Sequence, residues 1–234
     1  MQQSSLGAYS ILSREPVCSL AVAALGLTVM TGSSSDNDAS NGWEAVAGQW
    51  LERRQQSSIG VDVMRTWAGT LNGGSSILDL GCGSGVPVAQ ALMQAGFIVS
   101  GIDASPTLIA AFRSRFPRMM SACEPVETSR FLGRSYDAVI AIGLIFLLSE
   151  AAQTALLLKV GATLKVGGRF LFTAPVQACA WNDLMTGRES RSLGAAAYQP
   201  ILAHAGLTLA AEYTDEGQNH YYDTVRDGQL TLPE

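Results

Sequence analysis

The stretch Ile77-Leu78-Asp79-Leu80-Gly81-Cys82-Gly83-Ser84-Gly85 decides the fold class of this 234-residue chain. Its apolar first half predicts a buried strand, and its three alternating glycines predict a tight loop that leads into a helix over residues 87–95. Glycine lets the backbone turn sharply and come close to a ligand, and the amides of the helix beyond favour an electronegative group. The stretch therefore predicts a ligand-binding loop at the carboxyl end of a strand.

The spacing of the glycines separates two classes of nucleotide site. A dinucleotide fingerprint requires G-x-G-x-x-G, and its sixth position, counted from Gly81, is Val86 here. The pattern is instead acid-x-G-x-G-x-G, from Asp79 to Gly85. Eighteen residues beyond Gly85, Gly101-Ile102-Asp103 ends the next predicted strand, where a carboxylate can accept hydrogen bonds from both hydroxyls of a ribose. A nicotinamide-dependent dehydrogenase is therefore disfavoured.

Outside this loop, apolar runs bounded by turn residues alternate with helical patterns. The predicted strands cover residues 76–80, 97–102, 136–142 and 169–173, and the predicted helices cover 43–54, 61–71, 87–95, 106–116, 127–132 and 150–164. Strands separated by helices imply parallel crossovers and a sheet covered on both faces. After a helix over 195–205, strands over 207–214 and 219–226 are too close in sequence for a crossover and must be antiparallel. We predict an α/β fold, a doubly wound mixed sheet with an antiparallel C-terminal hairpin.

The composition narrows the class of partner. Hydrophobic residues make up 47% of the chain and charged residues 15%, which excludes a disordered chain and leaves enough apolar area for a core. The net charge is −5, and the only lysines are Lys159 and Lys165. Because no basic stripe is available for phosphate backbones, a nucleic acid is disfavoured as the main partner.

The four cysteines lie far apart in sequence. They are Cys18, Cys82, Cys123 and Cys179, and no C-x-x-C pair occurs among them. In a chain long enough to build its own core, this pattern predicts free thiols, a reducing compartment and a cytoplasmic location. No metal site is predicted.

The first forty residues differ from the rest. Residues 17–30 carry no charge but are too few to cross a membrane, which takes about 20 residues, and residues 31–41 resemble a linker. Three interpretations stay open: a membrane or export segment, a loosely attached extra element, or an over-extended gene start with Met30 as the alternative. We favour the last two. The predicted organisation is an N-terminal extension over 1–40, one domain over 41–234, and no stable membrane insertion.

Four elements in order carry a resemblance to a known family. They are the glycine loop, Asp103, Tyr136-Asp137, and Leu164-Lys165-Val166-Gly167-Gly168. From about Trp43 to Arg226, the chain resembles the class I S-adenosylmethionine-dependent methyltransferases. The resemblance implies a Rossmann-like, seven-stranded mixed sheet, S-adenosyl-L-methionine as cofactor, and methyl transfer to an O, N or S atom of a small-molecule acceptor. A non-catalytic module that binds the cofactor or S-adenosylhomocysteine stays the alternative.

The resemblance also implies roles for single residues. The loop glycines pass under the methionine and ribose of the cofactor, Asp79 orients the loop and is a candidate for holding the amino group, and Asp103 binds the ribose. Glu124 and a backbone amide of residues 123–127 face adenine; because Pro125 has no N–H, that amide comes from Val126 or is missing. Ubiquinone-type O-methyltransferases have a similar acid-x-Val-acid stretch there. The predicted cofactor-binding set is Asp79, Gly81, Cys82, Gly83, Gly85, Asp103, Ala104, Glu124, Val126, Ile142 and Gly143.

The acceptor is expected at the same edge of the sheet. Residues 142–148 carry no polar side chain, and neither the Asn/Asp-Pro-Pro-aromatic motif nor a Pro-Cys pair of base-methylating enzymes is present, which favours a small molecule. His220 is the candidate general base, oriented by Asp215 or Glu216, although a structural role for His220 stays equally open. The predicted acceptor-binding residues are Trp181, Arg188 and Tyr221, the first two in a loop over 181–192 that is a candidate lid.

Overall fold

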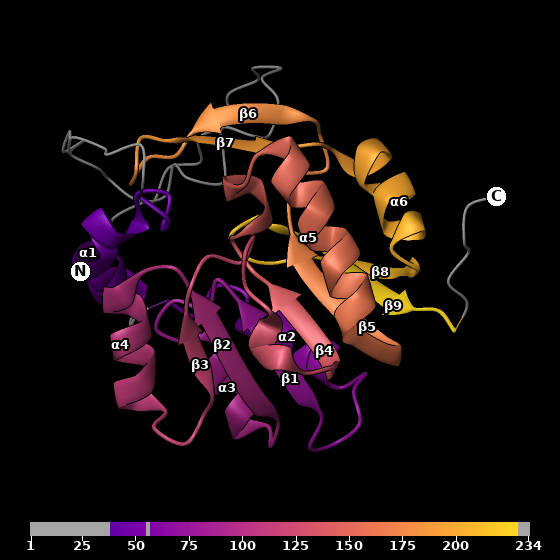
Figure 1. Cartoon of the computed structure of the whole chain (residues 1–234), viewed down its shortest axis with the longest axis horizontal. Helices are drawn as coiled ribbons and strands as arrows, with labels where there is room; N and C mark the ends of the chain where they lie inside the picture. Colours follow the sequence, from indigo (N-terminus) through magenta and orange to yellow (C-terminus); the bar gives the residue numbers. More distant parts are fainter. Residues whose placement is uncertain (1–37, 55–56, 229–234) are drawn as a thin grey trace, which may run out of the picture.

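The computed structural model describes residues 38–54 and 57–228 (Figure 1). Most of the predicted extension over 1–40 thus lies outside the described residues. Within the described ranges, no helix is both long and apolar enough to cross a membrane.

A seven-stranded sheet forms the centre of the molecule. Its spatial order is β3 (Ser121–Cys123), β2 (Ile98–Asp103), β1 (Ser76–Leu80), β4 (Tyr136–Ala141), β5 (Leu164–Thr173), β9 (His220–Arg226) and β8 (Leu207–Thr214). Neighbouring strands from β3 to β5 are parallel, whereas β9 is antiparallel to both β5 and β8. This order confirms the predicted doubly wound mixed sheet with an antiparallel C-terminal hairpin.

Helices cover both faces of the sheet. One core joins the sheet to α2 (Val61–Ala68), α3 (Val88–Gln94) and α4 (Pro106–Arg115), and the other joins it to α5 (Glu150–Thr163) and α6 (Ala195–His204). Successive side chains of a strand point to opposite faces of the sheet, so each strand contributes to both cores. In β1, Ile77 belongs to the first core, and Leu78 and Leu80 belong to the second.

Two predicted elements differ from the structure because of their backbone conformation. The helix predicted over 127–132 is instead a turn followed by the short 3-10 helix η2 (Phe131–Gly133), because Phe131 and Leu132 have positive φ of 52° and 57°. The buried Ser129 hydroxyl accepts the amide of Phe131 at 2.9 Å and so competes with helical bonding. In addition, β5 begins at Leu164 rather than 169, because an irregular register lets residues 164–168 join the strand.

The loop predicted over 181–192 is a hairpin. It forms β6 (Cys179–Asn182) and β7 (Glu189–Ser192), a two-stranded antiparallel sheet that lies across one edge of the main sheet (Figure 1). Contacts from α5 and α6 attach the hairpin to the rest of the domain. The Gln153 amide of α5 donates to the carbonyl of Arg191 at 2.9 Å, and the Tyr198 hydroxyl of α6 donates to Gln153 at 2.7 Å. Its polar sequence has no alternating apolar face, so periodicity could not indicate strands there.

The prediction that the cysteines are free thiols is wrong for one of them. Cys82 is buried and free, and Cys123 is exposed and free, as predicted. Cys179, at the start of β6, is disulfide-bonded, so the prediction of a free thiol there is wrong. Distance along the sequence does not limit which cysteines meet in space. Cys18 lies outside the described residues.

Candidate functional site

The carboxyl ends of β1, β2, β4 and β5 meet at one edge of the sheet. The helix α1 (Trp43–Arg54) and the β6–β7 hairpin lie at this edge (Figure 1). Open α/β sheets bind ligands outside these strand ends, and most of the predicted site residues follow them.

The glycines of the loop after β1 serve different purposes. Gly81, Gly83 and Gly85 all have positive φ, of 69°, 54° and 79°. A Cβ at Gly85 would lie 2.6 Å from the ring of Phe116, so packing of α4 requires a glycine there. A Cβ at Gly83 would meet only the indole nitrogen of Trp50, at 3.6 Å. Gly83 is therefore needed for its φ and leaves its outer face open, as a ligand-contacting residue would.

Asp103, at the carboxyl end of β2, faces this loop. One carboxylate oxygen accepts the amide of Gly83 at 2.8 Å, and the other accepts the amide of Ser105 at 2.9 Å. Burial raises the pKa of Asp103 above its ordinary value, although these two amides partly lower it. The carboxylate predicted to bind a ribose is thus tied to the loop predicted to carry the cofactor.

A second carboxyl group lies deeper at the same edge. Asp79 in β1 is only 3% exposed, and burial together with the Asp103 carboxylate raises the pKa of Asp79 well above its ordinary value. The positive charge of Arg54, the last residue of α1, acts in the opposite direction on this pKa, and the Arg54 guanidinium lies 5.6 Å from the ring centroid of Trp50. The edge therefore holds two shielded carboxyl groups whose ionised form a cationic ligand would stabilise.

The start of α1 is fastened to the start of α4. Glu44 accepts hydrogen bonds from the hydroxyl of Ser105 and from the amide and hydroxyl of Thr107, at 3.1 and 2.6 Å for the latter two. Burial alone would raise the pKa of Glu44, but these bonds hold it below its ordinary value. The amide of Glu44 in turn donates to the hydroxyl of Ser40 at 2.9 Å.

Two tryptophans of α1 lie near the glycine loop. The rings of Trp43 and Trp50 meet edge to face, with centroids 5.1 Å apart. Three buried side-chain atoms of the described residues have no hydrogen-bond partner: the Tyr222 hydroxyl in β9 and, on α1, the indole nitrogen of Trp43 and one guanidinium nitrogen of Arg53. Unpaired buried donors are rare, so α1 offers polar atoms that a ligand could satisfy.

The segment after β4 closes on the glycine loop. The side chain of Leu144 lies 3.2 Å from the place of a Cβ on Gly81. Gly143 has a φ of 75°, and its amide donates to the hydroxyl of Thr173 at 2.7 Å, while Ile142 packs against the core of α2–α4. The two residues predicted from this segment, Ile142 and Gly143, thus directly precede the residue that contacts the loop.

The loop after β3 borders a cavity of about 400 Å³. Glu124 begins this loop, and its amide donates to the carbonyl of Asp103 at 3.0 Å; Val126 is buried, and Ala104 directly follows Asp103. The cavity is lined by Asp38, Ala39, Asn41, Pro125, Glu127, Thr128, Leu147, Leu148 and Ser149. The residues predicted to face adenine therefore lie next to open space.

The predicted catalytic residues do not contact one another. Asp215 accepts the amides of Gly217 and Asn219, each at 2.9 Å, and the hydroxyl of Tyr221 at 2.8 Å. His220 instead has its Nε2 3.0 Å from Glu212. The prediction that Asp215 or Glu216 orients His220 is corrected: side chains alternate along β9, and the partner of His220 is on the paired strand β8.

Alternation also separates His220 from the predicted acceptor residue Tyr221. The ring of His220 packs edge to face on Tyr222, which belongs to the core of α5 and α6, whereas Tyr221 belongs to the core of α2–α4. Burial and the Asp215 carboxylate raise the pKa of Tyr221, so its hydroxyl stays protonated. Tyr221 lies on the Arg54 side of the sheet, with Asp215.

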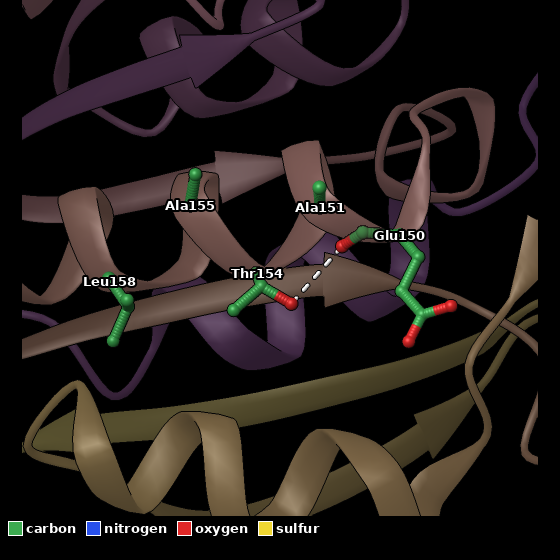
Figure 2. Close-up of a pocket in the computed structure, with 5 residues that line it drawn as sticks. All are labelled: Glu150, Ala151, Thr154, Ala155 and Leu158. Atoms are coloured by element: carbon green, nitrogen blue, oxygen red, sulfur yellow. Dashed lines mark hydrogen bonds between the residues drawn. The ribbon is translucent and has the colours of Figure 1, made fainter.

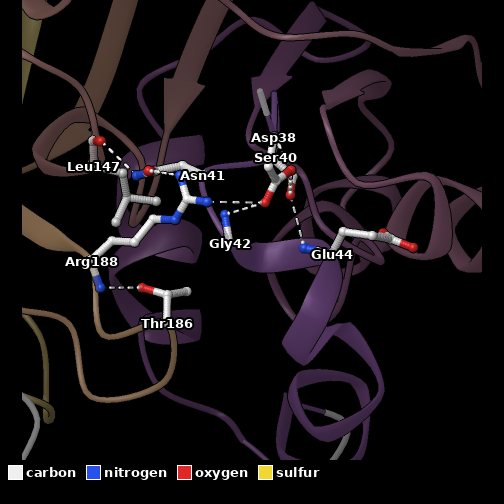
Figure 3. Close-up of polar contacts among 8 residues, drawn as sticks. All are labelled: Asp38, Ser40, Asn41, Gly42, Glu44, Leu147, Thr186 and Arg188. Atoms are coloured by element: carbon white, nitrogen blue, oxygen red, sulfur yellow. Dashed lines mark hydrogen bonds and ion pairs between the residues drawn. The ribbon is translucent and has the colours of Figure 1, made fainter. Parts of the chain in front are cut away.

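The β6–β7 hairpin brings Trp181 and Arg188 to the same edge. Trp181 packs on Phe146, with ring centroids 5.4 Å apart. Figure 3 shows Arg188 reaching the segment before α1, where it donates to the Asn41 side chain at 3.3 Å and lies 3.5 Å from the Asp38 carboxylate. Asn41 in turn donates to the carbonyl of Leu147 at 2.9 Å.

A larger depression, of about 590 Å³, lies elsewhere. Figure 2 shows its lining, which comes entirely from α5: Glu150, Ala151, Thr154, Ala155 and Leu158. It contains none of the predicted site residues and only one ionisable side chain. Within residues 38–54 and 57–228, no group of three His, Cys, Asp or Glu side chains could hold a metal ion.

Sequence reasoning does not assign Arg54 or Asp38 to the site. Arg54 comes four residues after Trp50 and so shares its face of α1, a signal that could have identified it. The partner of Asp38 is 150 residues away, and no local pattern indicates such a contact.

Comparisons with known proteins agree with this geometry. Residues 77–168 match a family model described as a methyltransferase domain. Among solved structures, the magnesium protoporphyrin IX methyltransferase from Synechocystis, with bound SAM, is 19% identical and matches over 84% of this chain and 87% of its own, with a TM-score of 0.57. The CcbJ methyltransferase from Streptomyces caelestis is 15% identical and matches over 83% of this chain and 100% of its own, with a TM-score of 0.63. A TehB-like SAM-dependent methyltransferase from Corynebacterium glutamicum is 16% identical and matches over 78% of this chain and 99% of its own, with a TM-score of 0.61.

At these identities, the likeness establishes a shared fold. A search of curated protein sequences finds no match to this chain.

Proposed function

We infer that this chain, whose residues 77–168 match a methyltransferase domain, is an S-adenosylmethionine-dependent methyltransferase that acts on an O, N or S atom of a small molecule. The observation that carries the inference is the bond from the Gly83 amide to Asp103, at the carboxyl edge of a sheet shared with enzymes solved with SAM or SAH bound. Neighbours of the fold described as porphyrin, glycopeptide and amino pentose methyltransferases support a small-molecule acceptor.

The residues present fit this cofactor. S-adenosylmethionine carries a sulfonium and an ammonium charge, and Asp79 and Asp103 are shielded carboxyl groups that a cation would stabilise in their ionised form. The open face of Gly83 lets a ligand approach the backbone, and the indole N–H of Trp43 is a donor still to be satisfied. Under this proposal Asp103 binds the ribose hydroxyls, and Asp79 faces the amino group.

The protein's own contribution is alignment, exclusion of water and proton handling. When bound, the cofactor supplies the methyl group as an electrophile on sulfur. The tryptophans of α1 and the β6–β7 hairpin would exclude water and align the acceptor for in-line attack. Where the acceptor is protonated at the working pH, the pair of His220 and Glu212 would take the proton.

The alternative function is a module that binds the cofactor without turnover. The apolar segment after β4, residues 142–148, favours it, because a polar group is common there in the family that the chain resembles. The ionisable residues at the β8–β9 turn favour the enzyme. Cofactor binding without methyl transfer to a broad panel of small nucleophiles would support the module.

The proposal is tested by calorimetric titration with SAM and SAH. We expect Asp103→Ala to weaken binding by about tenfold to a hundredfold, since bonds to a charged acceptor contribute about 1.5–3 kcal/mol each. Asp137→Ala is the matched control, because Asp137 lies at the opposite end of the sheet, where it bonds to Ser76 and Lys165. Equal affinities for wild type and Asp103→Ala, or a preference for NAD, would contradict the proposal.

We also propose a cytoplasmic location for the protein. The two free cysteines support it, and the disulfide at Cys179 counts against it.

A further inference from the structure

The loop after β3 is held at both ends by its backbone. The amide of Glu124 donates to the carbonyl of Asp103 at 3.0 Å, and the amide of Ser129 donates to the carbonyl of Pro125 at 3.0 Å. Between these bonds, residues 126–128 form a turn, and the side chain of Val126 is buried in the core of α5 and α6. The side chain of Val126 thus points into the core, whereas Pro125, Glu127 and Thr128 line the cavity.

Lys159 of α5 holds this turn from one side. Its ammonium group donates to the carbonyl of Val126 at 2.9 Å and to that of Glu127 at 3.2 Å, and it lies 4.4 Å from the ring centroid of Phe131. Burial lowers the pKa of Lys159, while the carboxylates of Glu124 and Glu127 act in the opposite direction. The cation therefore balances the two acids of the loop and orients two of its carbonyls.

The amides of the same turn are unused. Among the described residues, the N–H groups of Val126 and Glu127 donate to no acceptor. In a turn of helical sense, the peptide dipoles align, so carbonyls and amides point in opposite directions. The Val126 carbonyl that Lys159 binds shares a planar peptide with the Glu127 amide, so Lys159 fixes that amide directly. The Val126 amide shares its plane with the carbonyl of Pro125, which accepts the Ser129 amide, and the alignment of the turn that Lys159 holds keeps it parallel to the Glu127 amide.

We infer that Lys159 is a positioning residue for purine recognition: it holds the turn so that the Glu124 carboxylate and the Val126 amide meet the amino-pyrimidine edge of adenine. The inference rests on the proposed function, which places adenine at this loop. A carboxylate accepts from the exocyclic amine, and an amide donates to the adjacent ring nitrogen. Replacement of that amine by a carbonyl oxygen, as in hypoxanthine, reverses both requirements.

The test compares two ligands on four proteins by titration calorimetry. The ligands are S-adenosylhomocysteine and S-inosylhomocysteine, and the proteins are wild type, Lys159→Met, Lys159→Arg and Lys165→Met. Lys165→Met is the matched control, because Lys165 is the other lysine of the chain and bonds to Asp137 on the exposed surface. Lys159→Gln replaces Lys159→Met if the latter does not fold.

We expect wild type and Lys165→Met to prefer the adenosyl ligand by the same factor. In Lys159→Met that preference should fall about tenfold, mostly through weaker binding of the adenosyl ligand, and Lys159→Arg should restore most of it. An unchanged preference in Lys159→Met, or an equal loss of affinity for both ligands, would overturn the inference. If wild type binds neither ligand, the proposed function itself fails, which is a different outcome.

Discussion

The guanidinium of Arg188 lies 3.5 Å from the carboxylate of Asp38 and joins the β6–β7 hairpin to the segment before α1 (Figure 3). Asp38 also accepts the amides of Ser40 and Gly42, at 2.9 and 2.7 Å, so the ion pair acts on a segment that is already folded back on itself. A ligand at the glycine loop would lie beneath these two elements. The contact is therefore placed to retain it.

Asp38→Asn should shorten the time that a ligand stays bound. Each side chain of the pair is about 26% exposed, and partly exposed pairs contribute about 0–1 kcal/mol, so we expect the dissociation rate of SAH to rise by up to about fivefold. The effect should shrink as salt is added. Stopped-flow fluorescence would measure it, and Asp62→Asn, which breaks the exposed pair with Arg65 on α2, should leave the rate unchanged.

Gly83→Ala should separate a ligand effect from backbone strain. Gly83 and Gly96 both have positive φ, of 54° and 90°, and neither Cβ would meet protein atoms closer than 3.6 Å. Alanine at either position should therefore cost about 1 kcal/mol of stability. Only Gly83→Ala should lose SAH affinity, by tenfold or more. Normal binding by Gly83→Ala would remove the loop from the site.

Asp79→Asn should stabilise the ligand-free protein and weaken SAM binding. The pKa of Asp79 is raised in the folded state, so its contribution to stability is present at low pH and is lost as the pH rises through that pKa. Removing the carboxyl group should raise Tm at neutral pH and lower SAM affinity at least tenfold. In wild type, but not in the variant, SAM binding should release a proton, measured as a dependence of the binding enthalpy on buffer.

The control for this prediction is Asp223→Asn. Asp223 is equally buried, but it is already paired with Arg169 and accepts the indole N–H of Trp67 at 3.1 Å. Its substitution should lower Tm, because it leaves a buried cation unpaired. A lower Tm for ligand-free Asp79→Asn as well would show that Asp79 is ionised and paired without the cofactor.

His220→Ala should lower turnover without changing cofactor affinity. General base catalysis contributes about 10²–10⁴-fold, so we expect a loss of turnover of that order in His220→Ala. Glu212→Gln should cause a smaller loss of turnover, because Glu212 only orients the ring. His204→Ala is the matched control, since it removes the other described histidine, in the last turn of α6. Turnover of His220→Ala within threefold of wild type would leave alignment and exclusion of water as the whole mechanism.

The sequence by itself determines the glycine loop and the position of Asp103. The glycines after β1 and Asp103 at the end of β2 are recognisable because tight turns need glycine and buried strands need apolar runs. Parallel strands bring their carboxyl ends to one edge of the sheet. The glycine loop and Asp103 therefore lie side by side, regardless of which elements cover that edge. The antiparallel hairpin follows as well, from the short spacing of β8 and β9.

Only the tertiary structure decides which polar side chains pair. Glu212 rather than Asp215 contacts His220 because the register of β8 on β9, and the alternation of side chains across that pair, assign each to a face. Arg188 contacts Asp38 because a hairpin with no apolar alternation forms above the sheet edge. Such contacts join segments up to 150 residues apart, and no periodicity along the chain encodes them, since they arise from where whole elements pack.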